Sequence, residues 1–199
     1  MVVLHGFPSS GNTRKVRWAL EELGVPYELR VIDLPKGEQR RADYLALNPN
    51  GKVPTLVDDG LVLWESDAIL WHLATKHGGL VPDPIALGHQ WMFWNAHHLG
   101  EVTYKARVYR MTATRTGRPF DREHHAAITR GAGPTLAILD AHLAAHSHVV
   151  GSALSIADLA LAMNITFGIE EGAALEPFAR VHAWHDTLVA RPAFRASSP

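Results

Sequence analysis

The spacing of apolar residues changes once along this chain, at the segment Pro82-Asp83-Pro84. Before it, short apolar runs typical of strands alternate with stretches of helical spacing, whereas every apolar pattern after it has the period of a helix. We therefore predict an α/β domain over residues 1–78, a linker over residues 79–85 and an all-helical domain over residues 86–199. The length of 199 residues is enough for two such domains, each with its own core.

The start of the chain predicts a strand, a helix and a second strand. Residues 2–5 are aliphatic or β-branched, and apolar side chains alternate along residues 27–32, as in half-buried strands. Between them, apolar residues recur at helical spacing over residues 16–23, and Asn12 or Thr13 could cap the start of this helix. A right-handed crossover would make the two strands parallel neighbours.

A hairpin and a second helix complete the first domain. Residues 53–57 and 61–64 flank the turn Asp58-Asp59-Gly60, which predicts two antiparallel strands. Ser66 is a natural N-cap for the helix that follows, and the pair Gly78-Gly79 ends it. The predicted order is therefore β-α-β, a connecting segment, and β-β-α.

The second domain is predicted to contain helices only. A long helix is expected over residues 85–111, followed by a helical stretch interrupted at residues 131–134, where Pro134 should kink or restart it. Residues 155–158 (SIAD) have the spacing of a capping box, with a serine at the N-cap and an acidic residue three positions later. A last helix is predicted over residues 178–190.

The composition excludes several kinds of site. The chain has no cysteine, which rules out disulfides, thiolate nucleophiles and cysteine-ligated metals, so any thiol chemistry must use a sulfur of the ligand. Its 19 basic and 20 acidic residues give a net charge of −1 without runs of like charge, so we expect no nucleic-acid partner. No apolar run is long enough to cross a membrane and no secretory signal is recognisable, so we expect a cytoplasmic protein.

The 13 histidines invite a metal interpretation, since His142 and His146 are four residues apart and would share one face of a helix. The chain lacks the HExxH pattern and has no carboxylates at ligand spacing near these histidines. We therefore predict no metal site.

The loop between the first strand and the first helix has the character of an anion site. Residues 7–13 place hydroxyl and amide side chains, of which Ser10 and Asn12 are the best placed donors, at the positive end of a helix with free backbone N–H groups. The alternative is that these side chains are ordinary loop and cap residues.

Two further segments could present polar groups to a ligand. A cis bond before Pro54 would expose the backbone N–H and C=O of Val53, whereas a trans bond would mark only the start of an edge strand. Glu65 and Ser66 combine a carboxylate and a hydroxyl with the N–H groups of a helix start, which suits the ammonium and carboxylate of an amino-acid head group. The alternative is again a simple N-cap and its neighbour.

Four motifs occur in the same order as in one known family. They are SSGNTRKVR at residues 9–17, NPNGKVPT at residues 48–55, ESDAI at residues 65–69 and SIAD at residues 155–158. On these motifs the sequence resembles the cytosolic glutathione S-transferases over essentially its whole length, in particular bacterial, serine-type members. The resemblance implies a thioredoxin-like N-terminal domain followed by a helical domain, a homodimer, and glutathione as co-substrate.

The resemblance also implies which residues activate the glutathione sulfur. Ser10 stands where serine-type members place the hydroxyl that hydrogen-bonds the sulfur, and Asn12 matches a second polar residue of bacterial members. Tyrosine-type members have their catalytic tyrosine near the positions of His5 and Phe7, but this chain has no tyrosine there, so we do not expect tyrosine-type activation. Whether Ser10, Ser9 or Asn12 dominates is left open.

Six further positions match residues that bind glutathione in the family. These positions are Gln39, Lys52, Val53, Pro54, Glu65 and Ser66. The first two are expected to face the glycyl carboxylate, and the last two resemble the residues that hold the γ-glutamyl group. Between them, the backbone of the residue before the proline is expected to pair with the cysteinyl part.

The electrophile pocket is expected to involve Phe7, Trp94, Tyr104 and Arg107, because the corresponding helix lines that pocket in the family. Aromatic residues at helical spacing, as on this helix, are also typical of a packing face. If Arg107 lines the pocket, its positive charge would favour acidic substrates. The predicted activity is attack of a glutathione thiolate on a small electrophile. The alternatives are a noncatalytic interaction or regulatory protein and a glutathione-dependent isomerase of an unsaturated acid, and the electrophile itself is not identified.

Overall fold

The structure is a computed structural model that describes all 199 residues, which pack into two compact units. The first unit comprises Met1–Val81 together with Ala190–Pro199, and the second comprises Pro82–Val189. The end of the chain, which the sequence analysis assigned to the helical domain, therefore packs with the first unit.

The first unit is a four-stranded sheet with helices on both faces. Its strands are β1 (Val2–Gly6), β2 (Tyr27–Val31), β3 (Thr55–Asp58) and β4 (Leu61–Trp64). Its helices are α1 (Gly11–Glu22), α2 (Ala42–Leu45), α3 (Ser66–His77) and α10 (Pro192–Ala196), with a 3₁₀ turn, η1, at Glu38–Arg40. The predicted βαβ-ββα order of the thioredoxin-like domain is confirmed.

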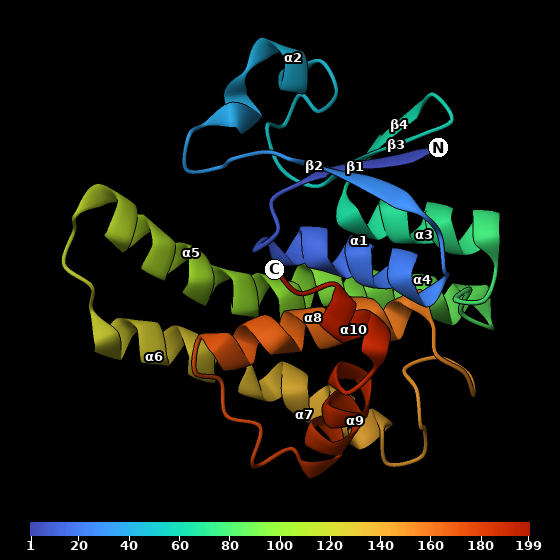
Figure 1. Cartoon of the computed structure of the whole chain (residues 1–199). Helices are drawn as coiled ribbons and strands as arrows, with labels where there is room; N and C mark the ends of the chain where they lie inside the picture. Colours follow the sequence, from blue (N-terminus) through green and yellow to red (C-terminus); the bar gives the residue numbers. More distant parts are fainter. The chain divides into compact units, whose positions relative to one another are not determined.

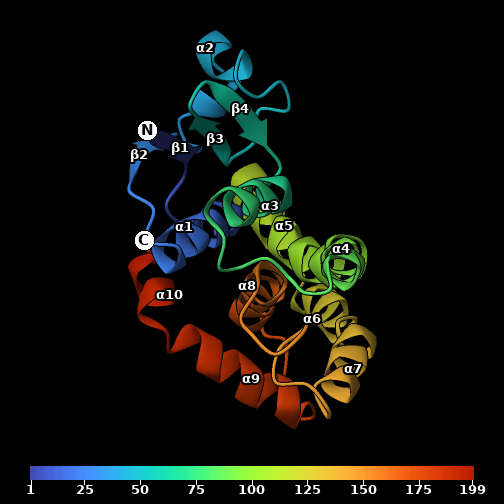
Figure 2. The same ribbon diagram turned by 90° about the vertical axis from the view of Figure 1, so that its right-hand side faces the viewer.

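The sheet has the strand order β2-β1-β3-β4 (Figure 1). As predicted from the crossover and the hairpin, β1 is parallel to β2, and β3 is antiparallel to both β1 and β4. Leu4 of β1 is paired with Leu56 of β3, and both side chains are fully buried. Helices α1 and α3 cover one face of the sheet and α2 lies on the other (Figures 1 and 2), so the core of this unit lies between the sheet and the α1/α3 pair.

The predicted helix caps were wrong at both helices of this core. Helix α1 begins at Gly11 with Ser10 as its N-cap, not with Asn12 or Thr13. Thr13 is instead fully buried, and its Oγ1 accepts a hydrogen bond from the Phe7 N–H at 3.3 Å. Helix α3 begins at Ser66 itself, so the N-cap is the preceding Glu65. At α1 the buried contact of Thr13 decides the cap, and at α3 the unusual backbone conformation of Glu65 decides it.

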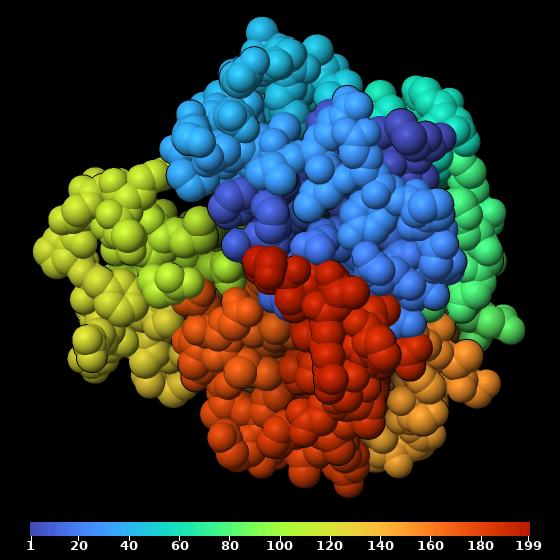
Figure 3. Space-filling view, in the orientation of Figure 1, coloured from blue at the N-terminus to red at the C-terminus, as the bar shows by residue number.

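The C-terminal segment is held against α1. The Arg191 guanidinium donates to both carboxylate oxygens of Glu22 at 2.6 and 2.8 Å, and the Phe194 ring meets Trp18 edge-on at a centroid distance of 5.0 Å. Arg17 donates to the carbonyl oxygens of Ala196 and Ser198. Figure 3 shows this end of the chain, in the deepest red, lying against the blue surface of α1.

The second unit is all-helical, as predicted. Its helices are α4 (Ile85–Trp94), α5 (Gly100–Thr116), α6 (Arg122–Arg130), α7 (Gly133–His142), α8 (Ile156–Glu170) and α9 (Ala179–Val189), with a π-helical segment, η2, at Asn95–Leu99. The predicted long helix is thus a run of α4, η2 and α5, and the predicted restart near Pro134 is the start of α7.

Helix α8 is the core of this unit, and it packs against α4, α5 and α9. Its predicted capping box is confirmed: the buried Asp158 carboxylate accepts hydrogen bonds from the backbone N–H and the hydroxyl of Ser155 at 2.9 and 3.0 Å. The Val149 N–H donates to the same carboxylate at 2.8 Å. None of the helices in the protein is long and apolar enough to cross a membrane.

Candidate active site

Helices α1 and α3 lie side by side in the first unit (Figure 2), and side chains at their N-termini are in contact. The Ser66 hydroxyl donates to Asn12 Oδ1 at 3.3 Å, and one helical turn deeper the Lys15 ammonium contacts Asp67. Each helix N-terminus presents backbone N–H groups without intrahelical partners and the positive end of its dipole. Two such ends next to one another form a surface suited to an anionic ligand.

The Ser10 hydroxyl is not used by the helix that it caps. The Ser10 carbonyl accepts from the Arg14 N–H at 2.8 Å, as an N-cap carbonyl should, but the side chain makes no capping hydrogen bond. Asp121, the N-cap of α6, shows the ordinary arrangement, since its carboxylate accepts from the two N–H groups of Glu123 and His124. The half-buried Ser10 hydroxyl is therefore available to a ligand at the positive end of α1.

The loop before β3 forms a third side of the site. The Val53–Pro54 peptide bond is cis, the first of the two alternatives considered for this bond. The Lys52 carbonyl accepts from the Tyr44 hydroxyl at 2.6 Å and from Asn48 Nδ2 at 2.9 Å. Burial raises the pKa of Tyr44, so its hydroxyl keeps the proton that it donates.

Tyr44 and Asn48 were missed as functional residues by sequence reasoning. Asn48 is the first residue of the motif at residues 48–55 but was given no role of its own, and no role was assigned to Tyr44. Both also lie within hydrogen-bond distance of the buried Thr55 hydroxyl, at 2.9 and 3.3 Å, so one polar cluster holds the segment between Lys52 and Thr55. The motif at residues 48–55 contains Asn48 and Thr55, but it does not reveal Tyr44, whose contact with them depends on how α2 folds back over the sheet.

A glycine allows the backbone of Gln39 to lie close to the loop that carries Lys52. Gly51 has a φ of 58°, and a Cβ at this position would lie 3.0 Å from the backbone carbonyl oxygen of Gln39. Glycine therefore allows η1 to pack directly against the residue before Lys52. Gln39 Oε1 is buried without a hydrogen-bond partner, and the Lys52 side chain is exposed.

Glu65 has an unusual backbone conformation directly before α3. Its φ of 72° and ψ of 112° lie in a region that residues other than glycine rarely adopt. Such conformations cost of the order of 1–3 kcal/mol and are found mostly at ligand sites. The Glu65 side chain is exposed beside Ser66 at the start of α3.

The predicted electrophile-site residues are divided between the units. Phe7 lies in the first unit, and the other three lie in the second. Trp94 packs edge-on against Trp91 at a centroid distance of 5.1 Å, and Tyr104 is 57% exposed. Arg107 donates to Glu170 Oε2 at 2.7 Å and lies 4.7 Å from the centre of the Phe167 ring, so its charge already has a partner.

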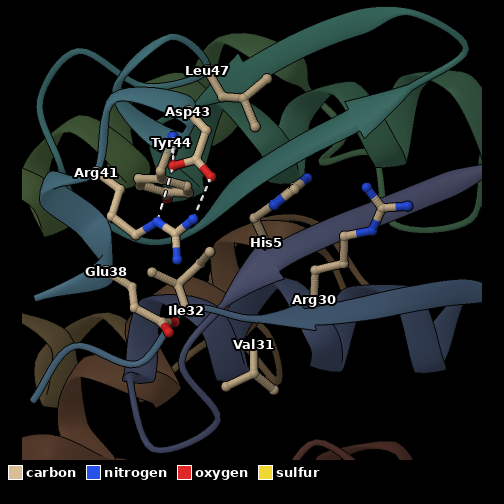
Figure 4. A pocket seen from close by; sticks show the side chains of 9 residues that line it. All are labelled: His5, Arg30, Val31, Ile32, Glu38, Arg41, Asp43, Tyr44 and Leu47. Atoms are coloured by element: carbon tan, nitrogen blue, oxygen red, sulfur yellow. Dashed lines mark hydrogen bonds and ion pairs between the residues drawn. The ribbon is translucent and has the colours of Figure 1, made fainter. Parts of the chain in front are cut away.

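A separate cavity of about 320 Å³ lies on the sheet face that carries α2 (Figure 4). It contains none of the predicted site residues, and its lining is His5, Arg30, Val31, Ile32, Glu38, Arg41, Asp43, Tyr44 and Leu47. Both arginines are paired with carboxylates, Arg30 with Glu28 and Arg41 with Asp43. Burial and the nearby Arg30 lower the pKa of His5, so this cavity offers no concentrated charge to a ligand.

Comparison with known proteins decides the family. Residues 9–76 match the family described as Glutathione S-transferase, N-terminal domain, and residues 119–192 match Glutathione S-transferase, C-terminal domain. Glutathione S-transferase GstB of Escherichia coli (strain K12) is 35% identical over 204 residues, which cover 98% of this chain and 96% of the relative. The chain belongs to the glutathione S-transferase family.

Solved structures agree with this assignment. Glutathione transferase F7 from Populus trichocarpa superimposes with a TM-score of 0.91 at 28% identity, over 99% of this chain and 97% of that one. The theta-class glutathione S-transferase from Xanthomonas axonopodis pv. citri, solved with glutathione bound, has a TM-score of 0.87 at 32% identity over 98% and 96% of the two chains. The predictions of the family, of the two-part fold and of a glutathione transferase enzyme are confirmed.

Proposed function

We propose that the paired N-termini of α1 and α3 bind glutathione, and that Ser10 stabilises its thiolate for attack on a small, uncharged electrophile. The observation that carries this proposal is the N-cap serine of α1, whose hydroxyl is left unused by its own helix. In a chain without cysteine, the reactive sulfur has to come from the ligand.

The polar groups of the site match the three parts of glutathione. The γ-glutamyl carboxylate binds at the start of α3, where Ser66 supplies its backbone N–H, and Glu65 receives the ammonium group. The cysteinyl part pairs with the backbone of Val53, in the loop that the Tyr44 cluster holds. The glycyl carboxylate faces the exposed ammonium of Lys52, with the carboxamide of Gln39 beside it.

In this mechanism Ser10 donates a hydrogen bond to the thiolate and does not remove the thiol proton, because an unassisted hydroxyl is too weak a base at neutral pH. The proton leaves to solvent, the sulfur forms a bond to the electrophilic carbon, and the leaving group departs with its electron pair. Lowering the thiol pKa by about 2 units corresponds to roughly 2.7 kcal/mol. One charge-assisted hydrogen bond and a helix N-terminus are sufficient for this.

The charges on α5 favour an uncharged electrophile over an acidic one. Arg107, which could have attracted a carboxylate, is paired with Glu170 and stacked on Phe167. On the same helix Tyr104, Val108 and Met111 follow one another at positions i, i+4 and i+7, and all three are exposed. The family resemblance assigns the electrophile to this helix, and an exposed apolar stripe suits an apolar substrate. We therefore prefer conjugation of an apolar electrophile to isomerisation of an unsaturated acid.

The same proposal includes a homodimer. The edge strand β4 exposes Leu61, Val62 and Trp64, with 47%, 38% and 40% of their surfaces accessible. Exposed apolar edge strands are normally covered in a stable protein. A second copy of the chain is the expected cover, and sedimentation as a monomer at micromolar concentration would contradict it.

Retention on immobilised glutathione and turnover with an aryl halide test the function. Wild type should be retained and active, whereas Ser10→Ala should bind glutathione and lose roughly 10- to 100-fold in turnover at neutral pH. Ser9→Ala is the matched control, since Ser9 is the exposed neighbour and should matter little. Binding without turnover on any electrophile would favour the noncatalytic alternative.

A further inference from the structure

A nearly buried lysine lies directly behind the proposed glutathione site. The Lys15 side chain, on α1, is only 4% exposed, and its ammonium contacts the carboxylate of Asp67 on α3. A buried ammonium is costly unless a carboxylate compensates it. The neighbouring Arg14 and Arg17 contact the C-terminal segment, whereas the Lys15 ammonium contacts α3.

Asp67 is the second residue of α3, directly after Ser66. A carboxylate in the first turn stabilises a helix, because it interacts with the positive end of the dipole. That same helix end is where the γ-glutamyl carboxylate of glutathione is proposed to bind. An uncompensated Asp67 would therefore repel the ligand and compete with it for the same positive field.

We propose that Lys15 is a positioning residue for the γ-glutamyl group, acting through Asp67. Its ammonium neutralises the Asp67 carboxylate, so the start of α3 can accept the carboxylate of the ligand. The same contact ties α3 to α1 next to the hydrogen bond between Ser66 and Asn12. Lys15 cannot bind the ligand itself, because its side chain is covered and its ammonium is engaged. This inference rests on the proposed glutathione site.

Removing the two charges one at a time should have different effects on the affinity for glutathione. Lys15→Met leaves Asp67 unpaired and should weaken glutathione binding about tenfold, which corresponds to 1.4 kcal/mol. Asp67→Asn removes the repelling charge, so glutathione should bind as well as to wild type or more tightly. The double variant carries neither charge and should regain most of the lost affinity. Lys15→Arg keeps the charge and should stay close to wild type.

The experiment measures the dissociation constants of glutathione and of N-butanoyl-cysteinylglycine by calorimetry. The second compound lacks the α-ammonium and α-carboxylate, so Lys15→Met should leave its affinity within about twofold. Saturating turnover should also be unchanged, because the thiolate is held by Ser10. Lys105→Met is the matched control, since Lys105 forms an exposed ion pair with Glu101 on α5.

Three results would overturn the inference. They are equal losses for both ligands in Lys15→Met, no recovery in the double variant, and weaker glutathione binding in a folded Asp67→Asn protein. Each single variant leaves one charge of the pair without its partner, whereas the double variant leaves neither. Where a single variant does not fold, the double variant therefore decides the matter: glutathione binding tenfold weaker than in wild type overturns the inference. If wild type itself does not bind glutathione, the proposed function fails first, and this inference fails with it.

Discussion

The hydroxyl of Tyr44 offers a direct test of how the loop before β3 is held. Tyr44→Phe removes one group that donates to the Lys52 carbonyl at 2.6 Å and lies 2.9 Å from Thr55 Oγ1. Asn48 Nδ2 remains within 2.9 and 3.3 Å of the same two oxygens, so neither is left without a partner. The loss should be close to two net hydrogen bonds, about 2 kcal/mol.

For a protein of this size, that loss should lower Tm by about 4–8 °C. Because the Lys52 carbonyl precedes Val53, whose backbone is proposed to pair with the cysteinyl part, the KM for glutathione should rise about three- to tenfold. Saturating turnover should change little, since Ser10 lies on another element. Thermal unfolding and steady-state kinetics with glutathione as the varied substrate measure both effects.

Tyr27→Phe is the matched control. The Tyr27 hydroxyl also has two partners, Arg17 Nε at 3.2 Å and Glu21 Oε1 at 3.0 Å, but it lies toward the surface and away from the loop. Its removal should cost less than about 1 kcal/mol and leave KM unchanged. The reasoning is refuted if the two variants behave alike, or if Tyr44→Phe is destabilised without any change in KM.

Three further changes test other parts of the molecule. Burial raises the pKa of the Glu171 carboxyl, but hydrogen bonds from Arg110 and His125 lower it more, so the pKa lies below its ordinary value. The stability that ionised Glu171 contributes is therefore complete above about pH 4.3 and is lost as the pH falls further. Glu171→Gln should lower the free energy of unfolding by about 2 kcal/mol at neutral pH, and this difference from wild type should disappear below about pH 4.3. A difference that stays constant with pH in urea denaturation would contradict this prediction. Glu170→Gln frees Arg107 and should raise kcat/KM for a carboxylate-bearing electrophile about three- to tenfold relative to its uncharged analogue; an unchanged ratio would show that Arg107 does not face the substrate. Phe194→Ala removes the ring that packs on α1 and should lower the free energy of unfolding by about 3 kcal/mol, whereas a loss below about 1 kcal/mol would mean that the C-terminal segment is only loosely held.

The parts of the fold that depend on local pattern could be predicted from the sequence. The hairpin around Asp58-Asp59-Gly60 and the capping box between Ser155 and Asp158 are set by a few adjacent residues, and the structure has both. The restart of a helix near Pro134 follows from the same kind of local constraint.

Features set by contacts between distant residues could not be predicted. Several neighbouring residues could cap α1, and the burial of Thr13 against the Phe7 N–H excludes it. The pairing of Arg107 with Glu170 could not be predicted either, because the two residues are 63 positions apart in the sequence. The packing of Phe194 on Trp18 likewise joins residues from opposite ends of the chain.

The residues of the candidate site also fall into those that short motifs predict and those that depend on distant contacts. Ser10, Val53 and Ser66 lie in short motifs that resemble a family, so their positions could be predicted. Tyr44 lies in no such motif, and its role depends on how α2 packs over the sheet. Thus the motifs predict which groups face a ligand, and this stays a prediction, whereas the contacts that hold the loop are found only in the structure.

The central claim, that Ser10 stabilises the glutathione thiolate, is tested most directly by titrating the thiol of bound glutathione. The ultraviolet absorbance of the thiolate, followed against pH at saturating protein, gives the pKa in wild type, Ser10→Ala and Ser9→Ala. The thiol pKa in wild type should lie about 2 units below that of free glutathione, and Ser10→Ala should return at least about 1 unit of this shift. Equal thiol pKa values in wild type and Ser10→Ala, or a larger change in Ser9→Ala, would contradict the assignment.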